Sequence, residues 1–252
     1  MTLSVETLVL RLKRPDTQFF RSARKAYDVC STANMPVPRF FKPVGRLLYE
    51  LRRYVPRVGR RFRTLLYTQP IFSCRCESVG KHLRLCAMPS VEGHTFIYIG
   101  DNVRFSGSLT IVSGKFRERP TLRIGNRVFL GHNVTITCNQ EVVLEDDVLI
   151  ASNCKISDYD GHPASMEKRI ARCDPDAEEI RPVRICKGAW IGFGVWIMKG
   201  VTIGEGSIVG AHSMVTHDVP PHCVVAGSPA RVVKNTESPT SANIAHEVSI
   251  AA

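Results

Sequence analysis

An aliphatic residue returns every six positions along much of this chain. Ile185, Ile191, Ile197, Ile203, Val209 and Val215 hold that spacing, and the same spacing joins three earlier groups: Ile99, Phe105 and Ile111; Ile124, Leu130 and Ile136; and Leu144, Ile150 and Ile156. A period of six fits neither an α-helix nor an alternating strand. It predicts a solenoid in which about 18 residues form a coil with three flat faces. Each face turns one aliphatic side chain inward, and Gly or Asn supplies the corners.

Residues 91–235 resemble the hexapeptide-repeat family in dozens of positions. This resemblance implies an all-β solenoid, specifically a left-handed parallel β-helix. The left hand comes from the resemblance alone, because crossover connections in proteins are otherwise right-handed. The alternative is a parallel-sheet protein whose buried strands are rich in Ile and Val. Six units in one uninterrupted register favour the solenoid.

Composition divides the 252-residue chain into four parts. We expect a loosely ordered extension at residues 1–38, a basic amphipathic helical segment at 39–70, the β-helix domain at 71–235 with a loop at 163–182, and a flexible tail at 236–252. Residues 71–95 are expected to be short strand-like pieces that lead into coils running from about 96 to 217. In the helical segment, Pro56 is expected to kink or divide the helix.

Most of the net charge of +11 belongs to the helical segment. Residues 39–63 contain nine Arg or Lys and one Glu, which gives +8, while Val44, Leu48, Leu51, Val55, Val58, Phe62 and Leu65 share one helical face. Nucleic-acid binding is disfavoured because no recognised fold for it is present. Two interpretations remain equally favoured: the apolar face packs on the solenoid, or the helix lies on an anionic membrane surface.

The remaining composition indicates a protein of the cytoplasm, peripheral to the inner face of a membrane if the helix binds lipid. No stretch is long enough to span a bilayer, and the N-terminus lacks the features of a signal peptide. The nine Cys are an odd number without a framework, which favours reduced thiols. Cys74, Cys76, His82 and Cys86 do not match a usual zinc set, so we favour packing for them and expect no metal.

The strongest chemical signal is the segment Ser157–Pro163, which reads SDYDGHP. His162 falls where the next inward aliphatic residue is due, six after Ile156, so the register breaks there. A neutral imidazole can act as a general base near neutral pH. Here the chain resembles the galactoside, maltose and nodulation-factor O-acetyltransferase branch, whose catalytic His lies in a matching G-H-P. The resemblance implies that His162 deprotonates an acceptor hydroxyl, which attacks acetyl-CoA directly, with Arg169 at a matching acceptor-binding place.

Three further residues are candidates for the acceptor side. Asp158 and Asp160 lie close to His162 in sequence, and either one can orient an imidazole and stabilise its cation. Both can equally be solvated corner residues. Asn133, in GHNVTI, matches an acceptor-contacting Asn of the resembled branch, although Asn is also an ordinary turn residue.

The last coils are expected to bind the acetyl-CoA donor. By resemblance, Trp190, Gly192, Ala211 and Thr216 line the pantetheine path, and Arg231 and Lys234 meet the nucleotide phosphates. His217 stands where relatives often have Lys, and Phe193 where sugar acetyltransferases have Ser. We interpret Trp196 as ordinary packing.

The leading hypothesis is an acetyl-CoA-dependent O-acetyltransferase that modifies a saccharide hydroxyl in polysaccharide or glycolipid assembly. Alternatives are a sugar N-acetyltransferase and a non-catalytic scaffold on the same solenoid. A hydratase like γ-class carbonic anhydrase is disfavoured because the close pair of His that it needs is missing after His162. The resemblance also implies a homotrimer, with active sites between neighbouring solenoids.

Overall fold

The computed structural model describes residues 42–174, 176 and 179–236, together with six positions between 18 and 28. The predicted tail beyond residue 236 lies outside the described residues, as does the predicted N-terminal extension apart from those six positions. Contacts divide the chain into two units, Met1–Pro56 and Arg57–Ala252. The solenoid lies entirely within the second unit.

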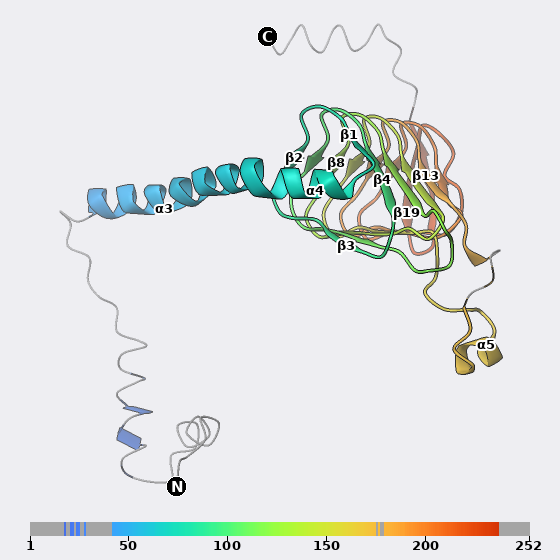
Figure 1. Cartoon of the computed structure of the whole chain (residues 1–252), viewed down its shortest axis with the longest axis horizontal. Coiled ribbons are helices and arrows are strands. Elements are labelled where there is room, and N and C mark those ends of the chain that lie inside the picture. Colours follow the sequence, from blue (N-terminus) through green and yellow to red (C-terminus); the bar gives the residue numbers. More distant parts are fainter. Residues whose placement is uncertain are drawn as a thin grey trace, which may run out of the picture. The chain divides into compact units, whose positions relative to one another are not determined.

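The second unit is built from three parallel sheets wound into a β-helix (Figure 1). We name them sheets A, B and C in the order in which the chain first visits them. Sheet A contains β1 (Ser78–Val79), β4 (Phe96–Ile99), β7 (Thr121–Ile124), β10 (Glu141–Leu144), β13 (Val183–Ile185) and β16 (Thr202–Ile203). Sheet B contains β2 (Arg84–Leu85), β5 (Arg104–Phe105), β8 (Phe129–Leu130), β11 (Leu149–Ile150), β14 (Trp190–Ile191), β17 (Ile208–Val209), β19 (Cys223–Gly227) and β20 (Ala230–Asn235). Sheet C contains β3 (Ser90–Glu92), β6 (Leu109–Val112), β9 (Val134–Thr137), β12 (Lys155–Ser157), β15 (Trp196–Ile197) and β18 (Met214–Val215).

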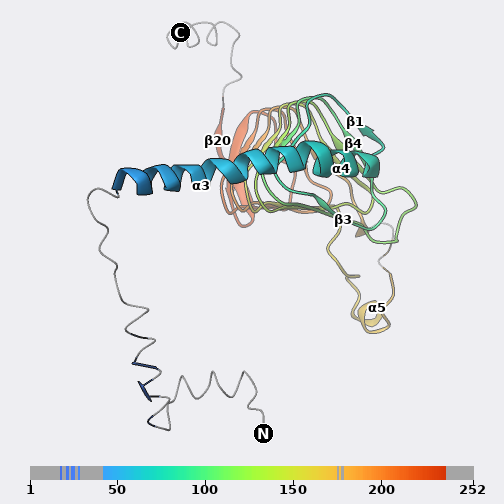
Figure 2. The ribbon, with the colours of Figure 1, turned by 60° about the vertical axis from the view of Figure 1, so that its left-hand side comes forward.

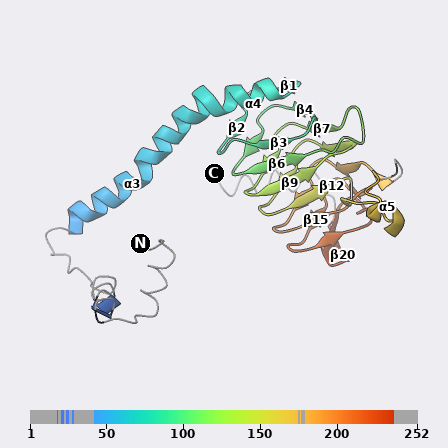
Figure 3. The same ribbon diagram turned by 60° about the horizontal axis from the view of Figure 1, so that its bottom comes forward.

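The six-residue repeat forms the core of this solenoid. Successive repeat residues occupy sheets A, B and C in turn, and equivalent residues of neighbouring coils pair directly, as Ile150 does with Ile191 and Ile191 with Val209. These three side chains are fully buried. Outward residues alternate with them, so each strand places one side chain in the core and the next on the surface. Figure 3 shows the successive rungs of sheet C along the stack.

The solenoid begins earlier than predicted. β1 pairs with β4, β2 with β5 and β3 with β6, so residues 78–92 form a complete first coil instead of a lead-in to coils at about 96. At the far end, β19 and β20 form an antiparallel hairpin on the edge of sheet B. Figure 2 shows β1 and β20 at opposite ends of the stack.

Helices precede the first coil. An α-helix, α3 (Lys42–Arg63), is followed by a π-helix at Thr64–Thr68 and by α4 (Gln69–Arg75). α3 continues through Pro56, so the expected division of the helix at this residue does not occur. In α4, Phe72 is 1% exposed and packs edge-on against Phe105, with ring centroids 6.2 Å apart. Phe72 therefore closes the first coil's end of the core. Among the described residues no helix is both long and apolar enough to cross a bilayer.

Of the four zinc candidates in this region, Cys76 has another partner. Cys76 donates its thiol hydrogen to the carbonyl of Phe72, and burial raises the pKa of Cys76 to about 11. His82 is a corner residue with φ of +62°. In the described part of the chain, no three His, Cys, Asp or Glu side chains gather as a metal-binding group.

Candidate active site

His162 lies on a long loop that leaves the corner between sheets C and A. The loop covers residues 158–182, between β12 and β13, and contains the short helix α5 (Met166–Ile170). The His162 side chain is exposed, while the adjacent Pro163 is buried. Gly161, with φ of +99°, supplies the left-handed turn that an L side chain rarely adopts. The G-H-P segment therefore presents an accessible imidazole between a tight turn and a packed proline.

Arg169 and Glu179 hold the backbone next to His162 from two sides. Arg169, on α5, donates from Nη1 to the carbonyls of Pro163 at 2.9 Å and Ala164 at 2.6 Å. Glu179 Oε1 accepts the backbone N–H of Ala164 at 2.9 Å. Arg169, predicted to bind the acceptor, thus bonds to its own loop. Glu179 was not among the predicted residues, because no local sequence pattern shows that residue 179, near the end of the loop, contacts residue 164, near its beginning.

Asp160 forms an ion pair with Lys199, whose Nζ lies 2.6 Å from Asp160 Oδ2. The Asp160 side chain is 41% exposed and that of Lys199 is 17% exposed. The pair links the His162 loop to the corner of the next coil. Lys199 was not among the predicted residues, although the repeat could have placed it: it follows Ile197 by two positions, as Asp158 follows Ile156.

Asp158 has a structural set of partners. Its carboxylate is fully buried and accepts the backbone N–H groups of Asn139 at 2.8 Å, Gln140 at 2.6 Å and Glu141 at 3.1 Å. Burial raises the pKa of Asp158, while these N–H donors act in the opposite direction. Both oxygens face the preceding coil, so the structure does not support the prediction that Asp158 orients His162.

Asn133 lies at the corner between sheets B and C. It adopts the left-handed conformation, with φ of +55°, and its Nδ2 donates to Oδ1 of Asn153, the equivalent residue of the next coil, at 2.9 Å. Its side chain is exposed. This is the geometry of a ladder of corner residues, with a polar side chain accessible from outside.

The predicted donor residues Trp190, Gly192 and Ala211 gather on sheet B and at the same corner. Trp190 is 50% exposed on the outer face of sheet B, and Ala211 is exposed at the corner. Packing between coils explains the glycine at position 192, because an added Cβ would lie 2.6 Å from the carbonyl oxygen of Val209. Close stacking of the coils therefore requires this glycine, whether or not a ligand lies nearby.

Arg231 and Lys234 extend this group along the hairpin. Both are exposed on β20. The register pairs Trp190 with Ile208, Ile208 with Val224 and Val224 with Lys234. Three strand spacings of about 4.8 Å, roughly 14 Å in all, therefore separate the Cα atoms of Trp190 and Lys234. An apolar strip on sheet B thus ends at two cations.

Thr216 and His217 lie apart from these donor residues. They follow β18 at the corner between sheets C and A, both are exposed, and Thr216 Oγ1 lies 2.8 Å from His217 Nδ1. The predicted residues therefore form two groups. The first, which we call the B–C group, contains Asn133, Trp190, Gly192, Ala211, Arg231 and Lys234. The second, the C–A group, contains Asp158, Asp160, His162, Arg169, Thr216 and His217. The two groups lie at opposite edges of sheet C, whose strands are up to about four residues long, so they are roughly 13 Å apart.

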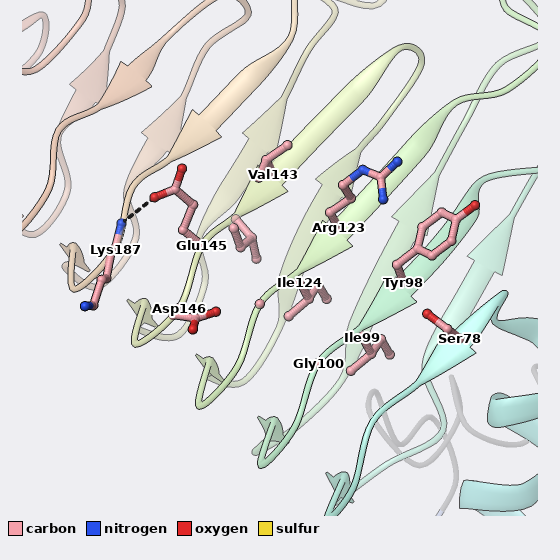
Figure 4. Close-up of a pocket in the computed structure, with 12 residues that line it drawn as sticks. Ser78, Tyr98, Ile99, Gly100, Arg123, Ile124, Val143, Glu145, Asp146 and Lys187 are labelled. Atoms are coloured by element: carbon pink, nitrogen blue, oxygen red, sulfur yellow. Dashed lines mark hydrogen bonds between the residues drawn. The ribbon is translucent and has the colours of Figure 1, made fainter.

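An open groove on the outer face of sheet A lies away from both groups. It has a volume of about 620 Å³ and is lined by 12 residues, none of them among the predicted site residues. Figure 4 shows Tyr98 and Arg123 side by side, with the guanidinium 4.7 Å from the ring centroid, and Glu145 accepting the backbone N–H of Lys187. We assign no function to this groove.

Comparison with known proteins identifies the family. Residues 121–157 match the hexapeptide repeat of succinyl-transferase, and residues 182–217 match the bacterial transferase hexapeptide. Galactoside O-acetyltransferase of Escherichia coli is 31% identical over 206 residues, which cover 80% of this chain and 90% of that protein. The chain therefore belongs to the hexapeptide-repeat acyltransferase family, and the predicted left-handed parallel β-helix is confirmed.

Two other similarities bear on the family and the fold. A probable acetyltransferase of Mycobacterium tuberculosis is 30% identical over 203 residues, and the chain spans 63% of that protein's length. The structure of AntD, an N-acyltransferase from Bacillus cereus solved with dTDP and coenzyme A, is 21% identical with a TM-score of 0.55. That match covers 73% of this chain and 97% of AntD, and it shows the fold.

Proposed function

We propose that the protein is an acetyl-CoA-dependent O-acetyltransferase that acts on a saccharide hydroxyl. Family membership supports the acetyl transfer, and the E. coli relative, a galactoside O-acetyltransferase, supports the saccharide and the hydroxyl. The observation that carries the residue assignment is the exposed His162, held on a loop that Arg169 and Glu179 fix. A general base must be accessible and also fixed in position.

In the proposed reaction His162 takes the proton of the acceptor hydroxyl. The hydroxyl oxygen forms a bond to the acetyl carbon, the bond from that carbon to sulfur breaks, and coenzyme A leaves as a thiolate that the imidazolium can protonate. No acyl-enzyme is formed. The Asp160–Lys199 ion pair holds the loop on the solenoid, and Asp158 supports the corner from which the loop starts.

The B–C group suits the donor. Trp190 offers a half-exposed apolar surface, while Arg231 and Lys234 offer exposed cations for phosphate groups. Thr216 and His217, also predicted to contact the donor, lie at the other edge of sheet C. In the proposed homotrimer, a neighbouring chain would bring Thr216 and His217 of one solenoid to Trp190 of the next.

The proposed location is the cytoplasm, at the inner face of a membrane. The eight described cysteines are free, in keeping with a reducing compartment. The acceptor would then be a saccharide of polysaccharide or glycolipid assembly.

Release of coenzyme A from acetyl-CoA, measured with a panel of sugars, tests this function. His162→Ala should lower turnover about 10²–10⁴-fold, while acetyl-CoA still binds. Including amino sugars separates O-acetylation from N-acetylation. Wild-type turnover of the variant on the best acceptor would contradict the role of His162, and acetylation confined to amino groups would replace the proposed reaction.

A further inference from the structure

The helix α3 and the π-helix after it carry exposed apolar side chains. The described ones include Val44 (46% exposed), Leu47 (60%), Leu48 (54%), Leu51 (46%), Phe62 (62%), Leu65 (63%) and Leu66 (74%). Large apolar side chains clustered at this exposure mark an interaction surface. Four of them, Val44, Leu47, Leu48 and Leu51, lie within two turns of α3, which is roughly 10 Å at about 1.5 Å per residue.

The basic residues of α3 are placed around the helix in a regular way. The helix contains eight Lys or Arg and a single Glu. At about 100° per residue, positions 44, 47, 48, 51 and 62 fall within an arc of about 120°. Lys42 and Arg46 lie on the opposite side, and Arg52, Arg61 and Arg63 flank the apolar arc. An arginine at that boundary can keep its guanidinium in water while the methylene groups of its side chain lie against an apolar surface.

We propose that α3 is an interfacial anchor that lies in the plane of an anionic lipid bilayer. The apolar arc would enter the boundary of the acyl chains, and the flanking arginines would meet the lipid phosphates. This surface is separate from the residues proposed for catalysis, so the proposal does not depend on the acetyl-transfer reaction.

Charge favours lipid over a second copy of this helix. Two such helices packed through their apolar arcs would bring Arg52, Arg61 and Arg63 of each close to those of the other, and each helix carries a net charge of about +7 from its eight cations and one Glu. Like charges across a contact oppose association. An anionic surface instead neutralises them, and each basic residue near it strengthens binding.

Flotation of the full-length protein with vesicles tests the anchor. Vesicles of phosphatidylcholine with about one third phosphatidylglycerol should carry the protein upward in low salt, whereas pure phosphatidylcholine vesicles should bind it at least about tenfold more weakly. Raising NaCl from 50 to 500 mM shortens the Debye length from roughly 14 to roughly 4 Å, so it should also weaken binding to the anionic vesicles.

A matched pair of variants separates the apolar arc from the charge. Leu51→Glu places a negative charge in the centre of the arc, and Tyr49→Glu places the same charge about 200° around the helix, on the polar side, at a residue that is 64% exposed. Leu51→Glu should weaken vesicle binding at least about tenfold relative to Tyr49→Glu. If both variants lose vesicle binding equally, the added negative charge alone explains the loss, and the proposal that the apolar arc inserts into the bilayer is wrong.

Two other outcomes would also overturn the proposal. If the wild type fails to float with anionic vesicles at low salt, α3 is not a lipid anchor. If Leu51→Glu changes the oligomeric state in light scattering while Tyr49→Glu does not, the arc is a contact between protein chains.

Discussion

Replacing Asp158 by Ala tests whether this buried carboxylate supports the fold or the chemistry. Its oxygens accept the N–H groups of three consecutive residues, Asn139, Gln140 and Glu141, in the preceding coil. Those residues turn the chain from sheet C into sheet A. Asp158 also accepts, through its own carbonyl, the N–H of Arg181 at 2.9 Å, where the long loop returns. The side chain and the backbone of one residue thus join two coils and both ends of the loop.

The expected loss of stability follows from the exposure of the three donors. Asn139 is 2% exposed, so its N–H would remain without a partner at a cost of about 1–3 kcal/mol. Gln140 and Glu141 are partly exposed and can bind water, so each loses only the net value of one hydrogen bond, about 0.5–1.5 kcal/mol. The variant should therefore be less stable by about 2–6 kcal/mol in total.

Denaturant unfolding at a fixed protein concentration measures this loss, because the stability of the proposed homotrimer would depend on concentration. Asp146→Ala is the matched control. Asp146 also accepts a backbone N–H across neighbouring coils, from Asn126 at 2.7 Å, but its side chain is 37% exposed. The control should lose about 1 kcal/mol or less, since water can replace the carboxylate.

The opposite pattern would refute this account of Asp158. If Asp158→Ala unfolds at the wild-type denaturant concentration but loses turnover with an altered pH–rate profile, the carboxylate acts on His162. In that case the hydrogen bonds to residues 139–141 contribute nothing measurable to the fold.

Three further predictions follow from the geometry. Arg231→Ala should raise KM for acetyl-CoA about tenfold and leave kcat and the denaturation midpoint unchanged, since the exposed guanidinium is assigned only to phosphate binding; an unchanged KM would remove it from the donor site. Glu179→Ala should lower kcat by about 10–100-fold through loss of the Ala164 contact, whereas Glu179→Gln, which keeps an acceptor oxygen, should restore most of the rate; equal rates for both variants would exclude a positioning role. Phe72→Ala should destabilise the solenoid by about 3–5 kcal/mol in denaturant unfolding because it opens the end of the core, and a loss under 1 kcal/mol would show that α4 is not needed there.

The solenoid was predictable because its repeat is read directly from the positions of its core residues. Each inward position needs an aliphatic side chain, and the corners impose a fixed count between them, so the period survives every substitution elsewhere. The first coil was missed although it carries the same signal. Val79, Leu85 and Val91 are six apart and pair with Ile99, Phe105 and Ile111. Two extra residues between Val91 and Ile99 shift the register and conceal the match.

The roles of the two aspartates could not be separated from sequence. Asp158 and Asp160 differ by two positions, yet one is buried against the preceding coil and the other pairs with Lys199 of the following coil. That difference arises because Asp158 is the first residue of the loop, at the corner of the solenoid, whereas Asp160 lies two residues further along it. The clamp of Arg169 and Glu179 depends on how the loop closes, which no periodic pattern encodes.

The separation of the predicted site into two groups leads to a test of the assembly. Asn133 and His162 lie at opposite edges of sheet C, roughly 13 Å or more apart, so one chain does not bring them to the same substrate. In a cyclic trimer the edge of one solenoid can face the other edge of its neighbour. His162→Ala and Asn133→Ala chains, each with low activity, should then complement each other when they are denatured together and refolded as mixed trimers.

The expected recovery can be worked out from the symmetry. A site is intact when its His162 comes from an Asn133→Ala chain and its Asn133 comes from a His162→Ala chain. In an equal, random mixture about a quarter of the interfaces meet that condition, so about a quarter of wild-type activity should return. Mixing the two variants without refolding supplies the control, because intact trimers do not exchange their chains at once. The contrary result would be that the refolded mixtures show only the summed activity of the two variants while light scattering confirms trimers. In that case Asn133 and His162 of each active site come from the same chain, and the loop carrying His162 must fold across sheet C when substrate binds.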